Sequence, residues 1–243
     1  MKRFLYGIDF GTTNSALAIY DEEKKEIHST IIIPSLIYFY HELQAGEKNY
    51  VVGEEAIAAY LSEGMKGRFI KSIKQILSRT SFSETRIQNR RYNASDLVAI
   101  ILKELKSRAD EIIGEDCQKA VIGRPVFFDD DNVQKDTLAQ NRLSKAAALA
   151  GFTEVRFQFE PIGAAFAYEQ TLTKKEKVLV ADLGGGTTDF TYLVLDPAKV
   201  GSQDRKEDMI ATGGIYIGGD SFDSAFMWEK GTPYFGKYTQ YEA

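Results

Sequence analysis

The sequence is poor in the residues that build disulfides, metal centres and nucleophile–histidine pairs. Its 243 residues include one cysteine, Cys117, and two histidines, His28 and His41. A single cysteine excludes an intrachain disulfide and a zinc site made of several cysteines. Two histidines argue against a histidine-ligated metal centre and against a serine–histidine–aspartate triad. The chemistry of this chain is therefore expected to rest on carboxylates, lysines, hydroxyls and backbone groups.

The chain also lacks an excess of positive charge and a long apolar run at its start. Its 30 lysines and arginines are outnumbered by 35 aspartates and glutamates, which gives a net charge of −5. A surface that binds nucleic acid needs a basic excess, so we expect no nucleic-acid partner. The opening MKRFLYGIDFG reaches an aspartate at position 9, too early for a signal peptide or a membrane anchor. We therefore expect a cytoplasmic protein without membrane contact.

What the sequence has instead is a pair of similar segments. Residues 4–21 read FLYGIDFGTTNSALAIYD, and residues 178–196 read VLVADLGGGTTDFTYLVLD. Each has an apolar strand, an aspartate, a Gly-Thr-Thr turn and a second apolar strand, so each predicts a β-hairpin. A Walker-type loop carries a lysine and opens a helix, and the dinucleotide fingerprint also opens a helix, so neither fits. The repeat indicates two related lobes, each beginning with a hairpin.

The segments between the hairpins predict an α/β domain with a mixed sheet. Apolar runs predict strands over residues 31–40, 119–126 and 155–161. Helical periodicity predicts helices over residues 54–62, 93–114, 133–150 and 161–170. In the second of these helices we expect Ser95 as the N-cap and Ile112 on the buried face. After the second hairpin, a strand is expected over residues 209–219, followed by the opening of a helix.

These elements predict a division of the chain into three parts. Residues 1–36 and 93–176 are expected to form the core of lobe I, and residues 37–92 its outer subdomain. Residues 177–243 are expected to form only the first part of lobe II, because the first lobe occupies far more of the chain. The chain is therefore expected to be a fragment, with a complete first lobe and a truncated second lobe.

Five segments together resemble the actin-like ATPase superfamily, and within it the DnaK-type heat-shock chaperones. In chain order they are GIDFGTTNSALAIY, AVIGRP, FEPIGAAFAY, VADLGGGTTDF and IGGDSFD. The stretch VRFQFEPIGAAFAYE is most similar to the YegD-like members. The resemblance implies an actin-like (ribonuclease H-like) fold with an ATP-binding cleft between two lobes and Mg²⁺ at its base. It also implies that the adenosine motif, and a peptide-binding domain if there is one, follow beyond residue 243.

The repeat and the resemblance together place a triphosphate between the two hairpins. Glycine-rich turns present backbone N–H groups to phosphate with little side-chain hindrance. The residues expected to bind ATP or ADP in this way are Gly11, Thr12, Thr13, Gly184, Gly185, Gly186 and Thr187. Gly218 and Gly219 resemble a family turn that contacts phosphate or ribose. The alternative is that these glycines only permit tight turns.

Four acidic residues are expected to serve the metal and the attacking water. Asp9 and Asp182 end their strands beside the glycines, and the resemblance implies that they hold Mg²⁺ through its water ligands. Their alternative role is to cap the hairpin turns. By the same resemblance, Asp189 orients or activates the water and Glu160 is a second catalytic carboxylate near it. Glu160 could also complement the dipole of the helix that follows.

A lysine is expected close to the terminal phosphate, since phosphoryl transfer depends on positioning and charge neutralisation. The segment GRFIKSIKQIL resembles the lysine-bearing segment of the family. Its register places Lys74 at that site as a catalytic residue, and Lys71 is the competitor.

The function implied is the ATP-binding and ATP-hydrolysing domain of a DnaK-type chaperone that assists protein folding. Unfolded polypeptides and co-chaperones are the partners implied for the full-length protein, and the present chain is expected to be a weak or inactive ATPase. One alternative is a small-molecule kinase, such as a sugar kinase, in which Asp189 could act as the base. Another is a non-catalytic, filament-forming actin relative. The segments FEPIGAAFAY and IGGDSFD favour the chaperone.

Overall fold

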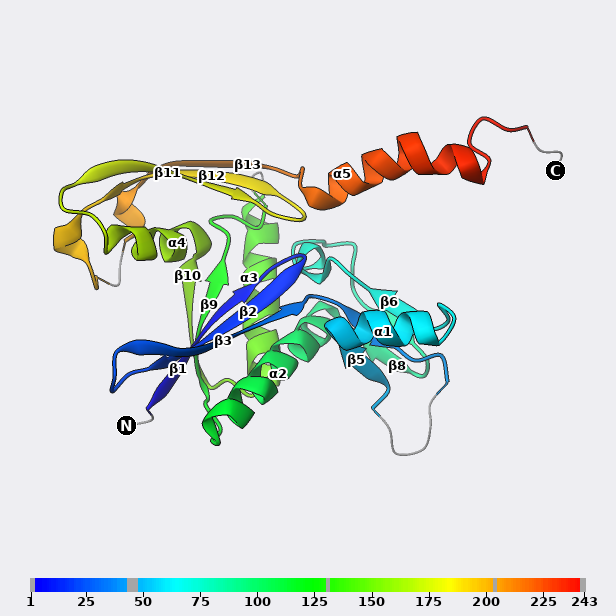
Figure 1. The fold of residues 1–243 in the computed structure, drawn as a ribbon, viewed down its shortest axis with the longest axis horizontal. Coiled ribbons are helices and arrows are strands. Elements are labelled where there is room, and N and C mark those ends of the chain that lie inside the picture. Colours follow the sequence, from blue (N-terminus) through cyan, green and yellow to red (C-terminus); the bar gives the residue numbers. More distant parts are fainter. Residues whose placement is uncertain (1–2, 43–47, 130–131, 203–204, 241–243) are drawn as a thin grey trace.

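The computed structural model describes residues 3–42, 48–129, 132–202 and 205–240. Figure 1 shows a large sheet with its helices, drawn in blue and green, and a smaller sheet, drawn in yellow and brown, that lies across one end of it. Among the described residues, none of the helices combines the length and hydropathy that a bilayer crossing requires.

The large sheet is mixed and has the strand order β10-β9-β1-β2-β3. Its strands are β1 (Phe4–Phe10), β2 (Asn14–Asp21), β3 (Glu26–Pro34), β9 (Lys119–Arg124) and β10 (Glu154–Phe159). β1, β2 and β3 are antiparallel neighbours, whereas β9 is parallel to both β1 and β10. The first predicted hairpin is thus confirmed as β1–β2. Helices α2 (Ala94–Ile113) and α3 (Val133–Leu149) pack with this sheet around a core that runs from Phe4 to Phe152.

The start of helix α2 differs from the sequence expectation. The N-cap is Asn93, not Ser95, because Asn93 accepts a hydrogen bond from the backbone of Asp96 while Asp96 accepts one from the backbone of Asn93. This capping box satisfies two N–H groups at once. Ser95 is buried and donates to the carbonyl of Arg142 on α3. Ile112, expected on the buried face, is 47% exposed.

The segment between β3 and α2 forms two small sheets beside the large one. One has the order β5-β4-β6 and the other pairs β7 with β8. The elements are β4 (Ile37–Phe39), β5 (Tyr50–Val52), α1 (Glu54–Ser62), β6 (Arg68–Ile70), the 3₁₀ turn η1 (Ile73–Ile76), β7 (Thr85–Ile87) and β8 (Arg90–Tyr92). Arg142 on α3 donates to the carbonyls of Ile76, Leu77, Arg79 and Phe82. This guanidinium therefore fixes the chain just after η1, which carries Lys74.

The smaller sheet is antiparallel, with the order β11-β12-β13. Its strands are β11 (Glu176–Leu183), β12 (Thr188–Leu195) and β13 (Met209–Ile215), so the second predicted hairpin is confirmed as β11–β12. The 3₁₀ turns η2 (Pro197–Lys199) and η3 (Lys206–Asp208) lie between β12 and β13. Helix α5 (Gly219–Phe226), the π turn η4 (Met227–Gly231) and the 3₁₀ turn η5 (Thr232–Phe235) project from the sheet as an arm.

Helix α4 (Glu160–Glu169) joins the two sheets in the chain but packs on the smaller one. Its Ile162 and Ala165 share a separate small core with Leu193 and Leu195 of β12. At the end of α4, the Glu169 carboxylate accepts two hydrogen bonds, at 2.6 and 2.7 Å, from a guanidinium that is also buried, that of Arg205. Helix α4 is thus bound to the second sheet at both its middle and its end.

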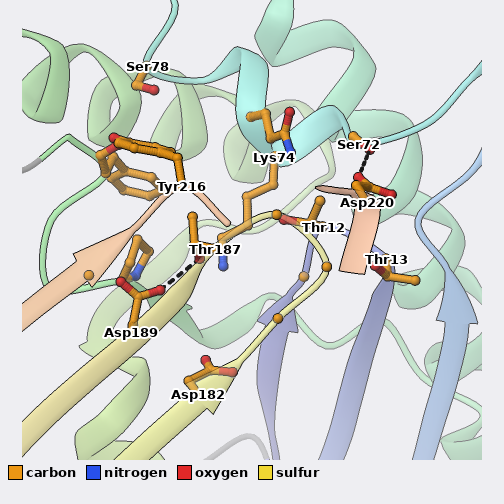
Figure 2. Close-up of a pocket in the computed structure, with 18 of the residues that line it drawn as sticks. Thr12, Thr13, Ser72, Lys74, Ser78, Asp182, Thr187, Asp189, Tyr216 and Asp220 are labelled. Atoms are coloured by element: carbon orange, nitrogen blue, oxygen red, sulfur yellow. Dashed lines mark hydrogen bonds between the residues drawn. The ribbon is translucent and has the colours of Figure 1, made fainter. Parts of the chain in front are cut away.

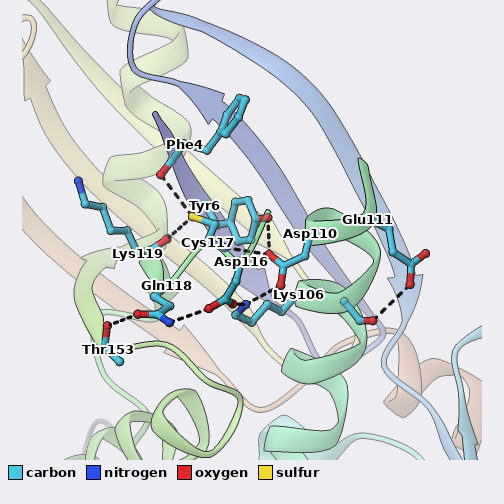
Figure 3. A network of polar contacts seen from close by, with 11 residues as sticks. Phe4, Tyr6, Lys106, Asp110, Glu111, Asp116, Cys117, Gln118, Lys119 and Thr153 are labelled. Carbon is cyan, nitrogen blue, oxygen red and sulfur yellow. Dashed lines mark hydrogen bonds and ion pairs between the residues drawn. The ribbon is translucent and has the colours of Figure 1, made fainter. Parts of the chain in front are cut away.

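A polar network fixes the start of β1 to helix α2 (Figure 3). The Tyr6 hydroxyl donates to Asp110 Oδ1 at 2.7 Å, and Lys106 donates to Asp110 and Asp116. Burial and the neighbouring Asp110 raise the pKa of the Tyr6 phenol. The charge of Lys106 is thus paired with two carboxylates. The network is structural, and it lies at the end of β1 away from the first hairpin turn.

Candidate functional site

A cavity of about 1270 Å³ lies between the two hairpins (Figure 2). Most of the residues predicted from the sequence line it together: Asp9, Gly11, Thr12, Thr13, Lys74, Glu160, Asp182, Gly184, Gly185, Gly186, Thr187 and Asp189. They come from both sheets, from η1 and from the start of α4. The fold therefore collects residues from four distant stretches of the sequence in one place.

The bare backbone of the second hairpin turn approaches the threonine side chains of the first. A Cβ atom at Gly185 would collide with Thr13 Oγ1, and one at Gly186 would lie 2.7 Å from Gln75 Nε2 and 3.3 Å from Thr12 Oγ1. Close contact with Thr13 therefore explains a glycine at position 185 better than a tight turn alone. At Gly186 the nearest atom is the end of the flexible Gln75 side chain, which can move away. N–H groups at such a place are open to an anion.

The first turn is supported by Ser35, a residue that the sequence did not single out. Its backbone N–H donates to the carbonyl of Thr13 at 2.7 Å, and its hydroxyl donates to the carbonyl of Gly11 at 2.8 Å. Ser35 and its hydroxyl partner Ser15 are both fully buried. The only local signal is that Ser35 follows Pro34, where the strand has to end.

Gly218 and Gly219 support the second turn from behind. Among the described residues they do not line the cavity. The N–H of Gly219 donates to the carbonyl of Gly184 at 3.1 Å, and a Cβ at Gly218 would lie 2.6 Å from that same carbonyl oxygen. Their contact with phosphate or ribose stays a prediction, since the backbone contact with the turn is what the structure gives.

Two aspartates stand opposite each other on the second hairpin. Asp182 on β11 and Asp189 on β12 are paired in register, so their side chains share one face. The Thr187 hydroxyl donates to Asp189 Oδ2 at 2.7 Å. Gly214 on the neighbouring strand β13 leaves room for the same carboxylate because it has no side chain; a Cβ at Gly214 would collide with Asp189 Oδ1. Like charges at directly opposed positions are destabilising, and a bound cation would offset that cost.

Lys74 and Glu160 form an ion pair at the side of the cavity. Lys74 Nζ lies 2.8 Å from Glu160 Oε1, and each side chain is 17% exposed. Burial raises the pKa of the Glu160 carboxyl, and the charges of Asp9 and Asp182 raise it further, while Lys74 lowers it. Lys71, the competing lysine, is 63% exposed and lies 3.5 Å from Asp220 Oδ1. Both lysines line the cavity, and Lys74 is the more buried of the two.

The charges of the cavity fit a divalent cation with a polyphosphate. Six carboxylates and four basic side chains line the cavity, so negative charge is in excess: Asp9, Asp129, Glu160, Asp182, Asp189 and Asp220 against Lys71, Lys74, Arg79 and Lys135. In the part of the chain that the structure describes, histidine, cysteine, aspartate and glutamate side chains form no group of three that could ligate a metal directly. Asp9 and Asp182 both line the cavity, and their role in holding the water ligands of Mg²⁺ stays a prediction.

The raised pKa of Glu160 gives a testable dependence of stability on pH. The folded state holds this proton more tightly than the unfolded chain, whose ordinary value is 4.5. The stabilisation is therefore complete below pH 4.5 and is lost as the pH rises through the folded pKa. Without Mg²⁺ and nucleotide, Glu160→Gln should gain unfolding free energy relative to the unmodified protein as the pH rises.

Urea unfolding of both proteins between about pH 4 and pH 8 measures this difference. Glu154→Gln is the matched control, since Glu154 is exposed on the neighbouring strand β10. If the difference in unfolding free energy between Glu160→Gln and the unmodified protein stays constant with pH, the pKa of Glu160 is not raised in the folded state.

Comparison with known proteins places these features in one family. The family model described as "Hsp70 protein" matches residues 5–230. The chaperone protein DnaK of Thermotoga petrophila is 36% identical over 234 residues, which are 93% of this chain and 35% of the relative. The chaperone protein DnaK of Thermosipho melanesiensis is 35% identical over the same coverage. The chain thus spans 35% of the length of these curated relatives.

Proposed function

Because this chain belongs to the Hsp70 family and has the actin-like ATPase fold, we propose that it binds ATP or ADP with Mg²⁺ in the cavity between the hairpins and hydrolyses ATP. The observation that carries this proposal is the glycine turn Gly184–Gly186, which faces Thr12 and Thr13 across the cavity beside the Lys74–Glu160 ion pair. Backbone N–H groups, hydroxyls and paired charges fit a phosphate ligand better than an apolar one.

The proposed site residues of the cavity have distinct tasks in this reaction. The N–H groups around Gly11–Thr13 and Gly184–Thr187 bind the phosphates, and Asp9 and Asp182 hold the waters of the metal. Bound Mg-ATP supplies the terminal phosphoryl group, which water accepts to give ADP and phosphate. Lys74 neutralises charge that develops on that group. Asp189 orients the water and accepts its proton. Glu160 holds the Lys74 ammonium in position through their ion pair.

The proposed biological role is that of a DnaK-type chaperone. The relatives are named chaperone proteins, and we extend that role to the full-length form of this protein. Unfolded polypeptides are the proposed clients, co-chaperones are the proposed regulators, and the cytoplasm is the proposed location. Similarity to the YegD-like members stays a prediction.

Hydrolysis of Mg-ATP by the full-length protein, with and without a permanently unfolded polypeptide, tests this function. We expect hydrolysis, and we expect the polypeptide to accelerate it. Conversion of ATP to ADP with the phosphoryl group transferred to a sugar hydroxyl instead of to water would indicate a kinase. Nucleotide-dependent light scattering without hydrolysis would indicate a filament-forming protein. Absence of both hydrolysis and nucleotide binding contradicts the proposed function.

A further inference from the structure

The carboxylate of Asp220, in the first turn of α5, has a partner on the opposite lobe at each of its two oxygens. Ser72 Oγ donates to Asp220 Oδ2 at 2.7 Å, and Lys71 Nζ lies 3.5 Å from Asp220 Oδ1. Ser72 and Asp220 are 148 residues apart in the sequence. Figure 2 shows the bond between them at the edge of the cavity, beside the turn with Thr12 and Thr13. All three residues line the cavity.

The backbone of Asp220 is fixed to the second hairpin turn. Its N–H donates to the carbonyl of Gly185 at 2.8 Å, and the preceding N–H, of Gly219, donates to the carbonyl of Gly184 at 3.1 Å. A Cβ at Gly218 would lie 2.7 Å from both the carbonyl carbon and the carbonyl oxygen of Gly185, so the two backbones are in direct contact. A displacement of Asp220 therefore displaces the turn that faces Thr13.

The backbone of Ser72 has a strained conformation. Its φ of 55° lies in the left-handed region, which non-glycine residues adopt with strain. The chain has glycine in that region at Gly53, Gly64 and Gly67. Lys25 and Met65 adopt similar φ values, so the evidence that the Ser72 hydroxyl is used is its bond to Asp220. Ser72 also directly precedes η1, the turn that carries Lys74.

We propose that Asp220 is a positioning residue for ATP hydrolysis: through Ser72, it holds the Gly184–Gly185 turn in a fixed place relative to Lys74. This inference rests on the proposed function. Lys74 belongs to lobe I and the turn to lobe II, so their spacing depends on contacts that cross between the lobes. The Ser72–Asp220 bond is such a contact. Asp220 is hydrogen-bonded through its backbone to Gly185 of the turn, and Ser72 lies two residues before Lys74.

The Lys71–Asp220 pair contributes less than the hydrogen bond. The Lys71 side chain is 63% exposed and the Asp220 side chain 31% exposed, and ion pairs of this kind are screened by water. The hydrogen bond from Ser72 has a charged acceptor, which makes it the stronger of the two contacts. Removal of either Ser72 Oγ or the Asp220 carboxylate should therefore have a similar effect.

The test compares four variants: Asp220→Ala, Asp220→Asn, Ser72→Ala and Ser72→Gly. The control is Asp223→Ala, which removes an exposed carboxylate from the same helix. Hydrogen exchange without nucleotide reports the two linked segments, residues 70–76 and 184–188. We expect faster exchange in both segments for Asp220→Ala, Ser72→Ala and Ser72→Gly. Asp220→Asn should retain partial protection, because its amide oxygen still accepts from Ser72.

The second measurement is the single-turnover rate constant at saturating Mg-ATP in the full-length protein. We expect a decrease of roughly tenfold for Asp220→Ala, the factor for one hydrogen bond to a charged group. A merely structural role would lower the amount of active protein but not this rate constant. Ser72→Gly separates strain from bonding, since it relieves the backbone and should still behave as Ser72→Ala.

The outcomes separate this proposal from the proposed function. Unchanged exchange in Asp220→Ala shows that the contact does not hold the turn and overturns the proposal. Faster exchange with an unchanged rate constant overturns the positioning role, while the ATPase function stands. If the unmodified protein itself neither binds nor hydrolyses ATP, the proposed function fails and the positioning role fails with it.

Discussion

Replacing Lys74 with alanine should slow ATP hydrolysis on the order of 100-fold and leave the affinity for Mg-ATP within about threefold of its original value. The expected split follows from the division of tasks in the cavity. Backbone N–H groups of the two turns are placed to bind the phosphates, whereas the Lys74 ammonium, 2.8 Å from Glu160, supplies charge where it develops during transfer. Single-turnover hydrolysis and calorimetric titration with Mg-ATP measure the two quantities separately.

The fold should survive this substitution. Burial and the neighbouring aspartates already raise the pKa of Glu160, so the carboxyl that loses its partner can take up a proton instead of remaining as a buried charge. Lys103→Ala, which truncates an exposed lysine on α2, is the control for a general loss of positive charge. Equal losses in rate and affinity for Lys74→Ala contradict the catalytic role. A larger rate effect for Lys71→Ala would transfer that role to Lys71.

Gly185→Ala should lower kcat/KM for ATP by about 100-fold. The new methyl group would occupy the place of Thr13 Oγ1, so either the lobes move apart or the threonine rotates away. In both cases the Thr13 hydroxyl and the second turn lose their relative positions. The φ of Gly185 is one that alanine can adopt, so the loss should come from the interlobe contact and not from backbone strain.

The matched control for this substitution is Gly213→Ala on β13, where a Cβ meets nothing within 4 Å. A double-mutant cycle with Thr13→Ala sharpens the test, because removal of the obstructing hydroxyl should cost activity in the unmodified protein and little in Gly185→Ala. Strict additivity, or equal kinetics for Gly185→Ala and Gly213→Ala, shows that the two turns do not meet as described.

The hairpins could be predicted from the sequence because their signals are local. An apolar strand, a glycine-rich turn and a second apolar strand lie within some twenty residues, and β1–β2 and β11–β12 follow that pattern. The family motifs then carried most of the candidate site, including Lys74 and Glu160. The cap of α2 also has a local signal, the capping box of Asn93 with Asp96, which the choice of Ser95 overlooked.

The residues missed by the sequence are those whose role depends on distant contacts. No local motif marks Ser72, because its hydrogen-bond partner Asp220 lies 148 residues away in the sequence. Ser35 supports the first turn only because β2 and β3 pair around it. At the end of α2, helical periodicity points to Ile112, but Ile113 is the residue that packs against the core. In each case the interaction lies between segments that the sequence keeps apart.

The packing of α4 on the second sheet has a consequence for the order of events on the ribosome. The larger core ends at Phe152, so it is complete in the nascent chain while β12 is still to be made. Ile162 and Ala165 then wait for Leu193 and Leu195, about 2 to 6 seconds at the usual rate of about 5–20 residues per second. During that interval α4 is an uncovered apolar helix with Glu160 at its tip. The two hairpins can meet only after β11 and β12 have been made, so the cavity between them forms later than the larger core.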